Sequence, residues 1–196
     1  HQANHRSRVE RRDSVRLGRM MPTVWEDTRQ QVGKHEHKRR WFKAHGVEVQ
    51  RKKLETGDYE RADGASNILI DTKRSLDEVS MDVGRDHARF ARELDRARDA
   101  GCRLVVLIEV GAPYKSLDDV ARWYPMPCRR CELRGHFCEP RSQGRCQRFK
   151  RKPMQGPTLL RIMRTLEEKH GCRFEIVHPA HSAARICELL GIEVSK

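Results

Sequence analysis

Two aspartates and a lysine stand at spacings that suit phosphodiester chemistry. Asp58 follows Gly57 at the start of one strand-like run, and Asp71 and Lys73 lie near the end of the next. Antiparallel pairing would bring both carboxylates to one end of a sheet, and Lys73, two residues after Asp71, shares its face. Carboxylate oxygens bind Mg²⁺, which lowers the pKa of a bound water and neutralises phosphate charge. The lysine would then orient or help to deprotonate that water, or stabilise the transition-state charge.

Each of these pieces also has an ordinary structural explanation. Gly-Asp-Tyr is a common turn sequence, and Asp-x-Lys alone indicates nothing, so each is more often a solvated turn than a site. The indication comes from their order along the chain, because the two strand-like runs are followed directly by a capped helix. Ser75 and Glu78 have the spacing of a capping box at the start of that helix.

Strands and helices alternate along the chain around these residues. Hydrophobic periodicity and glycines at the ends of several runs predict them. The predicted strands cover residues 23–27, 47–50, 57–59, 67–71, 103–110 and 174–177, with a turn at 63–64 joining the third and fourth as a hairpin. The predicted helices cover residues 34–45, a segment from 75, 86–99, 158–170 and 182–190. This order predicts an α/β fold of three layers, with helices flanking a mixed sheet.

The composition excludes several classes of protein. The chain has 196 residues, of which 37% are hydrophobic and 35% charged, which suits one domain of ordinary size with a real core. Its longest purely apolar run, residues 104–108, is far shorter than the ~20 residues that cross a bilayer. The first 20 residues are rich in Arg and lack the apolar centre of a signal peptide. A membrane protein, a secreted disulfide scaffold and a fibrous repeat are therefore excluded, and we expect an intracellular protein.

The positive charge is concentrated in two segments. The formal net charge is +13, and residues 1–20 carry six Arg against two acidic residues while residues 128–152 carry nine Lys or Arg against two Glu. Residues 55–99 are acidic on balance. A basic body with an acidic pocket favours a nucleic-acid partner, and the alternative is a solvated basic surface. We expect residues 1–21 to be a disordered basic leader or an upstream extension outside the fold.

Four successive motifs resemble the XPF-type nuclease domain of the PD-(D/E)xK superfamily. They are Asp27-Thr28-Arg29, Leu54 to Tyr59, Ile70 to Asp77, and Leu104 to Glu109, and the similarity covers about residues 22–190 apart from a Cys-rich segment. The family signature is Gly-Asp, a variable stretch, then Glu-Arg-Lys-x-x-x-Asp. Asp71 stands in the Glu place, Lys73 in the Lys place and Asp77 in the closing Asp place, whereas Thr72 replaces the family's Arg.

The resemblance implies a restriction-endonuclease-like fold and a Mg²⁺-dependent (or Mn²⁺-dependent) DNA endonuclease. It implies action on branched or flapped DNA in repair, recombination or replication, and a possible homodimer. It assigns Asp27, Asp58 and Asp71 to the metal, Lys73 to the water, and places Arg29 and Asp77 in the catalytic set. Thr72 removes a cation that the family has beside the site, so the substrate geometry is left open.

Four residues in or near this set have alternative explanations. Arg29 either forms a local ion pair or positions a phosphate. Asp77 lies in the first turn of the capped helix, where a carboxylate is favourable against the helix dipole without any catalytic role. Arg89 and Glu93 on the following helix either face the site or form a solvated helix face, and we expect the latter.

A Cys-rich segment, residues 125–152, interrupts the predicted nuclease domain of residues 22–124 and 153–196. Cys128, Cys131, Cys138 and Cys146 have a spacing that suits a tetrahedral Zn²⁺ site, with His136 as a substitute ligand. An iron–sulfur cluster, a disulfide or unliganded thiols are the alternatives. The remaining cysteines, Cys102, Cys172 and Cys187, are expected to be buried or inert thiols.

We expect this Cys-rich insertion to hold the DNA backbone beside the site through its cations, and the alternative is a structural knob without DNA contact. Those cations include Arg129, Arg130, Arg134, Arg145, Arg148 and Lys150. Two other functions compete with the nuclease. One is a catalytically inactive DNA-binding module of the same fold, and the other is a zinc-bearing adaptor for nucleic acid or protein.

Overall fold

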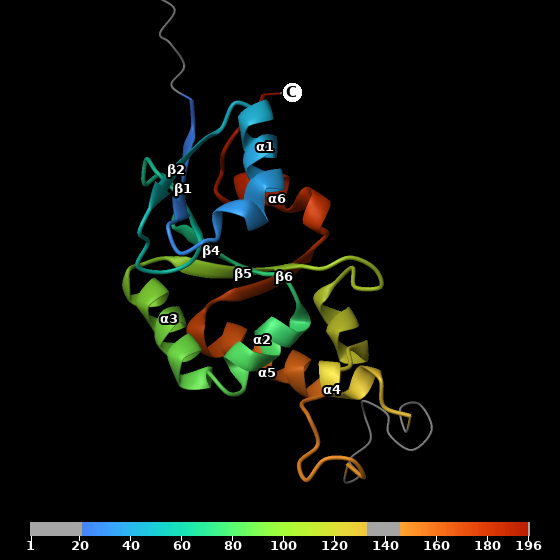
Figure 1. The fold of residues 1–196 in the computed structure, drawn as a ribbon. Coiled ribbons are helices and arrows are strands. Elements are labelled where there is room, and N and C mark those ends of the chain that lie inside the picture. Colours follow the sequence, from blue (N-terminus) through green and yellow to red (C-terminus); the bar gives the residue numbers. More distant parts are fainter. Residues whose placement is uncertain (1–20, 133–145, 196) are drawn as a thin grey trace, which may run out of the picture.

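A single mixed sheet of six strands forms the centre of the protein (Figure 1). The structure, a computed structural model, describes residues 21–132 and 146–195. The strand order is β2-β1-β3-β4-β5-β6. The strands are β1 (Thr23–Asp27), β2 (Glu48–Lys52), β3 (Tyr59–Arg61), β4 (Ile68–Lys73), β5 (Arg103–Glu109) and β6 (Arg173–Val177). Strand β3 runs antiparallel to both neighbours, and the other pairs are parallel.

Helices cover both faces of the sheet, which gives the three layers predicted from the sequence (Figure 1). One face carries α1 (Glu36–Ala44) and α6 (Ser182–Leu189), and the other carries α2 (Leu76–Val83), α3 (His87–Asp99) and α5 (Gly156–His170). Two apolar cores result. Val106 and Phe174 belong to the core under α2, α3 and α5, whereas Tyr59 and Leu107 belong to the core under α1 and α6. The predicted fold class is confirmed.

The strand pattern explains which residues face the site. Strand β5 is buried from Leu104 to Glu109 because helices cover both of its faces. Leu69 packs in the α2 and α3 core, and Ile70 packs in the opposite core. Because side chains alternate along a strand, Asp71 and Lys73 lie on the α2 and α3 side with Leu69.

A second charged cluster is buried beneath α1. Lys38, which is fully buried, contacts Glu109 at 2.5 Å, and Arg39 pairs with the buried Glu26. The hydroxyl of Tyr59 donates to Glu26 at 3.2 Å. These pairs join α1 to the ends of β1, β3 and β5, so they fix the strand ends on the face opposite Asp71.

Several short helices were not predicted. They are η1 (Val32–His35), η2 (Leu117–Arg122), α4 (Met126–Arg129) and η3 (Pro179–His181). The predicted helix 34–45 is in fact η1 followed by α1, and short 3-10 turns of this kind lack the long apolar periodicity that prediction needs. Within the described residues, no helix combines the length and the apolar character that crossing a bilayer requires.

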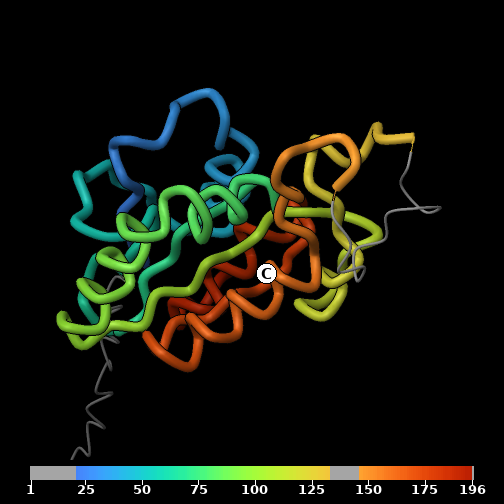
Figure 2. The backbone as a smooth tube through the Cα atoms, turned by 90° about the horizontal axis from the view of Figure 1, so that it is seen from below, coloured from blue at the N-terminus to red at the C-terminus, as the bar shows by residue number. Residues whose placement is uncertain are grey.

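The described parts of the Cys-rich segment, residues 125–132 and 146–152, lie at one end of the molecule (Figure 2). The described residues on both sides of 133–145 extend from α4 and from the start of α5, away from β2 and β1 (Figure 2). Residues 133–145 and 1–20 lie outside the described part of the chain, so the predictions for Arg134, His136, Cys138, Arg145 and the basic leader fall there.

Candidate active site

The hairpin of β3 and β4 brings Asp58 next to Asp71. Tyr59 pairs with Ile70 in antiparallel register, and the Asp58 amide donates to the Ile70 carbonyl at 2.6 Å. Gly57 permits this approach because its φ is +76° and a Cβ would lie 2.9 Å from the Ile70 carbonyl oxygen. Any other L-residue would be strained there. The hairpin predicted from Gly-Asp, a strand and Asp-x-Lys is therefore present, and it places Asp58 beside the strand that carries Asp71.

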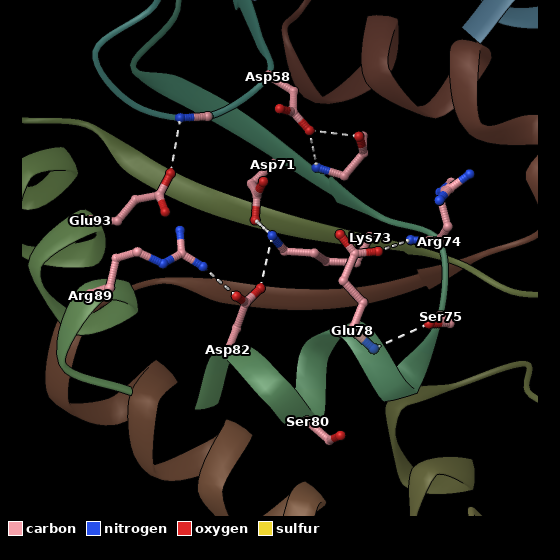
Figure 3. Close-up of polar contacts among 12 residues, drawn as sticks. Asp58, Asp71, Lys73, Arg74, Ser75, Glu78, Ser80, Asp82, Arg89 and Glu93 are labelled. Atoms are coloured by element: carbon pink, nitrogen blue, oxygen red, sulfur yellow. Dashed lines mark hydrogen bonds and ion pairs between the residues drawn. The ribbon is translucent and has the colours of Figure 1, made fainter. Parts of the chain in front are cut away.

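An alternating chain of charges extends from Asp71 to the surface (Figure 3). The Lys73 Nζ lies 2.9 Å from Asp71 Oδ2 and 2.9 Å from Asp82 Oδ2. The other oxygen of Asp82 accepts from Arg89 at 2.6 Å, and the Arg89 side chain is 59% exposed. Asp71 and Asp82 are buried, so the chain joins a buried acid to a solvent-facing guanidinium.

The Asp58 carboxylate is held by β4. Asp58 Oδ2 accepts from the Thr72 amide at 2.8 Å and from the Thr72 hydroxyl at 2.7 Å. Glu93 of α3 approaches from the other side and accepts from the Gly57 amide at 3.4 Å (Figure 3). Asp58, Asp71, Asp82 and Glu93 thus contribute four carboxylates to one region, against two cations.

Burial and charge act in opposite directions on Asp71 and Lys73. Burial raises the pKa of Asp71 well above its usual value, and the neighbouring Asp58 and Glu93 raise it further, although Lys73 opposes them. Burial alone would lower the pKa of Lys73, but the carboxylates of Asp71 and Asp82 outweigh burial and raise it. Lys73 is therefore a stable ammonium, and a further cation beside Asp71 would favour its ionised form.

These oxygens match the ligand chemistry of a hard divalent cation. Asp71 Oδ2 and Asp82 Oδ2 are buried without a well-aligned hydrogen bond, although Lys73 lies close to both. Mg²⁺ prefers carboxylate and water oxygens, and the excess of carboxylates over cations matches its charge. Among the described residues, no three His, Cys, Asp or Glu side chains are already grouped as a metal site. Asp58 and Asp71 are the pair that would hold the ion, with water as the further ligands.

Asp27 and Arg29 are joined to each other. The Arg29 guanidinium pairs with Asp27 Oδ2 and also donates to the Leu54 carbonyl at 2.8 Å. The other Asp27 oxygen accepts from the Leu54 amide at 3.3 Å. The Asp27 backbone lies beside Asp58, with its amide 2.8 Å from the Asp58 carbonyl oxygen. The structure thus places the Asp27 main chain at the site, while its carboxylate holds the loop that leads to Gly57.

Asp77 connects α2 to the insertion. Its Oδ1 accepts from the Met126 amide at 2.9 Å, and its Oδ2 pairs with Arg129 of α4. Both oxygens are therefore engaged by the start of the Cys-rich insertion, an interaction that neither the helix-dipole explanation nor the site explanation included. Arg129 is accordingly half of an ion pair, whereas Arg130, Arg148 and Lys150 are exposed.

Three residues of the charged region were missed or only partly placed from the sequence. Asp82 was not considered, although its position on the buried face of α2, with Leu76 and Val79, is a signal that could have found it. A charged residue on a buried helix face needs a partner. The expected solvated helix face fits the exposure of Arg89, whose side chain is 59% exposed, whereas Glu93 is half-buried. Both residues also contact the charged region, Arg89 through Asp82 and Glu93 through the Gly57 amide.

The described cysteines fall into two groups. Cys172 and Cys187 are buried, and burial raises the pKa of each thiol to about 12, which makes them inert at neutral pH. Cys102 is partly exposed. In the insertion, Cys128 Sγ accepts from the Gln155 side chain at 3.4 Å, and Cys146 Sγ accepts from the Phe149 amide at 3.2 Å.

Comparison with known proteins supports the fold. No model of a known protein family matches the chain, and no curated protein matches it. Among solved structures, XPF from Aeropyrum pernix is similar, with a TM-score of 0.53 and 20% sequence identity. The similarity covers 87% of this chain and 60% of that chain, so the present chain spans less than two thirds of the length of that protein. The protein therefore has an XPF-like α/β fold.

Proposed function

We propose that the protein is a metal-dependent nuclease that hydrolyses phosphodiester bonds in DNA. The observation that carries the proposal is the arrangement of Asp58, Asp71 and Lys73 at the end of the β3–β4 hairpin, in an XPF-like fold. Two carboxylates and an ammonium at the end of one hairpin are groups that metal-assisted phosphodiester hydrolysis uses. The net charge of +13 suits a polyanionic substrate.

Each side chain has a role in this mechanism. Asp58 and Asp71 would hold Mg²⁺ or Mn²⁺, and such an ion supplies an activated water and neutralises phosphate charge. Lys73 is kept protonated between two carboxylates, so it orients the attacking water and stabilises charge on the phosphate rather than acting as a base. Arg89, paired with Asp82 and 59% exposed, would be available to contact a neighbouring phosphate of the DNA.

We propose branched or flapped DNA as the substrate, and a homodimer as the assembly, from the resemblance to XPF-type nucleases. The test is a cleavage panel of linear duplex, single strand, 3′ flap, fork and four-way junction with Mg²⁺, Mn²⁺ or EDTA. We expect metal-dependent cleavage that favours a branched substrate. Sedimentation of the protein with and without DNA tests the assembly.

Two variants make the cleavage panel decisive. Asp71→Ala should lose cleavage by several orders of magnitude and retain DNA binding, whereas Asp99→Asn at the exposed end of α3 should cleave normally. Equal cleavage by Asp71→Ala and the parent chain would reject the site.

A DNA-binding module without turnover is the second candidate function. The observation that favours it is that Arg29 neutralises the Asp27 carboxylate, so the three-aspartate ligand set implied by the resemblance is not assembled among the described residues. Tight DNA binding without cleavage of any substrate in either metal would support this candidate.

For the insertion, we propose a structural Zn²⁺ bound by Cys128, Cys131, Cys138 and Cys146. Hydrogen bonds donated to Cys128 and Cys146 are of the kind that stabilises metal-bound thiolates. Elemental analysis should find one zinc per chain in the parent protein and none in Cys128→Ser, with Cys187→Ser as the matched control. Iron and absorption in the visible range would instead identify an iron–sulfur cluster.

A further inference from the structure

Thr72 makes two contacts with a single oxygen atom. Its amide and its hydroxyl both donate to Asp58 Oδ2, at 2.8 and 2.7 Å, and the Thr72 side chain is buried. Thr72 lies between Asp71 and Lys73 on β4, so it belongs to the strand that carries the other acid of the site. Its position therefore couples the two carboxylates through one strand.

The main chain of Asp58 is fixed as well. Its amide donates to the Ile70 carbonyl, and its carbonyl accepts from the Asp27 amide at 2.8 Å. With the backbone and Oδ2 both held, rotation of the carboxylate is restricted. Among the described residues, no hydrogen bond to Asp58 Oδ1 is found, so this is the oxygen left for a ligand.

We propose that Thr72 is a positioning residue that presents Asp58 as a one-oxygen ligand and thereby favours Mg²⁺ over Ca²⁺. The inference rests on the proposed function, because it takes Asp58 to be a metal ligand. Mg²⁺ demands six ligands at short distance in near-octahedral geometry, which single carboxylate oxygens satisfy. Ca²⁺ accepts six to eight ligands and often binds both oxygens of one carboxylate. The two hydrogen bonds that Thr72 donates to Asp58 Oδ2 oppose binding of one ion by both oxygens of Asp58.

This role differs from the one that the resemblance would suggest. The XPF-type signature has Arg where this chain has Thr72. In this chain, the cation beside the site is therefore replaced by a hydroxyl that donates to Asp58, the proposed metal ligand. A purely structural role for Thr72, as a tie between β3 and β4, predicts a change in stability but none in the preference between two cations.

The experiment measures metal binding without DNA and without turnover. The full chain is titrated with Mn²⁺ by electron paramagnetic resonance, and the bound Mn²⁺ is then displaced with Mg²⁺ or with Ca²⁺. Thr72→Val removes the hydroxyl at nearly constant shape, and Thr72→Ser restores it. Circular dichroism melting establishes that each variant is folded, and Thr72→Ala replaces Thr72→Val if that variant does not fold.

We expect the ratio of Mg²⁺ to Ca²⁺ affinity to fall roughly tenfold in Thr72→Val, the size of effect that ligand-orienting residues usually have. Thr72→Ser should keep the ratio of the parent chain. An unchanged ratio in Thr72→Val, with metal still bound, overturns the role of Thr72 and leaves the proposed function intact. If the parent chain binds no divalent ion and cleaves no DNA, the proposed function fails first.

Discussion

At the scale of single residues, the site is a balance between buried acids and one ammonium. Lys73 lies 2.9 Å from both Asp71 and Asp82, and Asp82 also accepts from Arg89. Asp82 therefore shares Lys73 with the proposed metal ligand and keeps the ammonium from neutralising Asp71 alone. A divalent ion at the proposed site would compete with Lys73 for Asp71, and the second partner of Lys73, Asp82, would make that competition easier.

Asp82→Asn should raise the concentration of Mg²⁺ that gives half-maximal cleavage. Without the Asp82 charge, Lys73 pairs more strongly with Asp71, so the metal must displace a stronger competitor. We expect an increase of roughly tenfold, the usual effect of a residue that orients a ligand. The measurement is a Mg²⁺ titration of cleavage, with Asp86→Asn as control. An unchanged Mg²⁺ requirement would show that Asp82 does not regulate Asp71 through Lys73.

Asp71→Asn should gain stability relative to the parent chain as pH rises. The folded-state pKa of Asp71 is raised by burial, so between about pH 4 and that higher value the folded chain binds more protons than the unfolded chain. The free energy of unfolding of the parent chain therefore falls as pH rises through this window, because Asp71 becomes ionised. An Asn side chain does not titrate, so the variant does not lose this contribution. Melting temperatures of both chains in EDTA, from pH 4.5 to 8, measure the difference. A constant difference across this range would contradict a raised Asp71 pKa.

At the scale of elements, the β3–β4 hairpin depends on the conformation of the loop before it. Gly57 has a positive φ and lies where a Cβ would be 2.9 Å from the Ile70 carbonyl oxygen. Gly64, in the turn between the two strands, also has a positive φ, but nothing lies within 4 Å of its Cβ position. A substitution at Gly64 therefore measures the cost of the left-handed backbone alone, whereas a substitution at Gly57 adds the cost of a steric contact with β4.

Gly57→Ala should destabilise the fold more than Gly64→Ala. Both changes incur the left-handed conformation, which costs about 1–2 kcal/mol for an L-residue. Gly57→Ala additionally forces β3 away from β4, because the new Cβ would lie 2.9 Å from the Ile70 carbonyl oxygen. This shift would lengthen the hydrogen bonds between Asp58 and Thr72. Urea unfolding gives the two stabilities, and cleavage should fall only for Gly57→Ala. Equal losses of stability would mean that the hairpin tolerates the added methyl group.

Asp77→Asn should loosen the start of the insertion. The Asp77 carboxylate accepts a hydrogen bond from the Met126 amide and forms an ion pair with Arg129. The neutral side chain of Asn can keep the hydrogen bond but loses the ion pair. Hydrogen exchange at the Met126 amide should accelerate, while Arg129→Ala should give the same result from the other partner. A loss of cleavage with unchanged Met126 protection would instead assign Asp77 to the catalytic set.

At the scale of the whole molecule, two surfaces of positive charge can be compared. Arg130 and Lys150 are exposed on the insertion, whereas Arg40 and Lys43 are exposed on α1, across the sheet from the site. If the insertion holds DNA, replacing the first pair by Ala should reduce the salt dependence of DNA binding by about two counterions, at roughly 0.9 per phosphate contact. Replacing the second pair should not. DNA binding measured from 50 to 200 mM salt tests this, with Asp71→Ala as the background, which is expected not to cleave. Equal slopes for the two double variants would favour an insertion that is structural and makes no DNA contact.

The sequence predicted the fold and the proximity of Lys73 to Asp71 because both depend on local patterns. Period-2 alternation placed Asp71 and Lys73 on one face, and Gly57 marked the close turn. Asp82 was missed because its importance depends on which face of α2 packs on β4. The pairing of Asp77 with Arg129 depends on side-chain rotamers between distant segments, for which one sequence carries no periodic signal. The pairing of Asp27 with Arg29 is local, between residues two apart, and a local ion pair was one of the two explanations given for Arg29.

The short helix α2 joins two parts of the molecule that the chain separates widely. Asp77 in its first turn anchors α4, and Asp82 near its end restrains Lys73; the two lie roughly 7.5 Å apart along the axis at 1.5 Å per residue. A rigid rod this short transmits a displacement at one end to the other almost undiminished. If the insertion contacts DNA, as proposed, a displacement of α4 would be passed through Asp77 and α2 to Asp82, and so to the ammonium of Lys73.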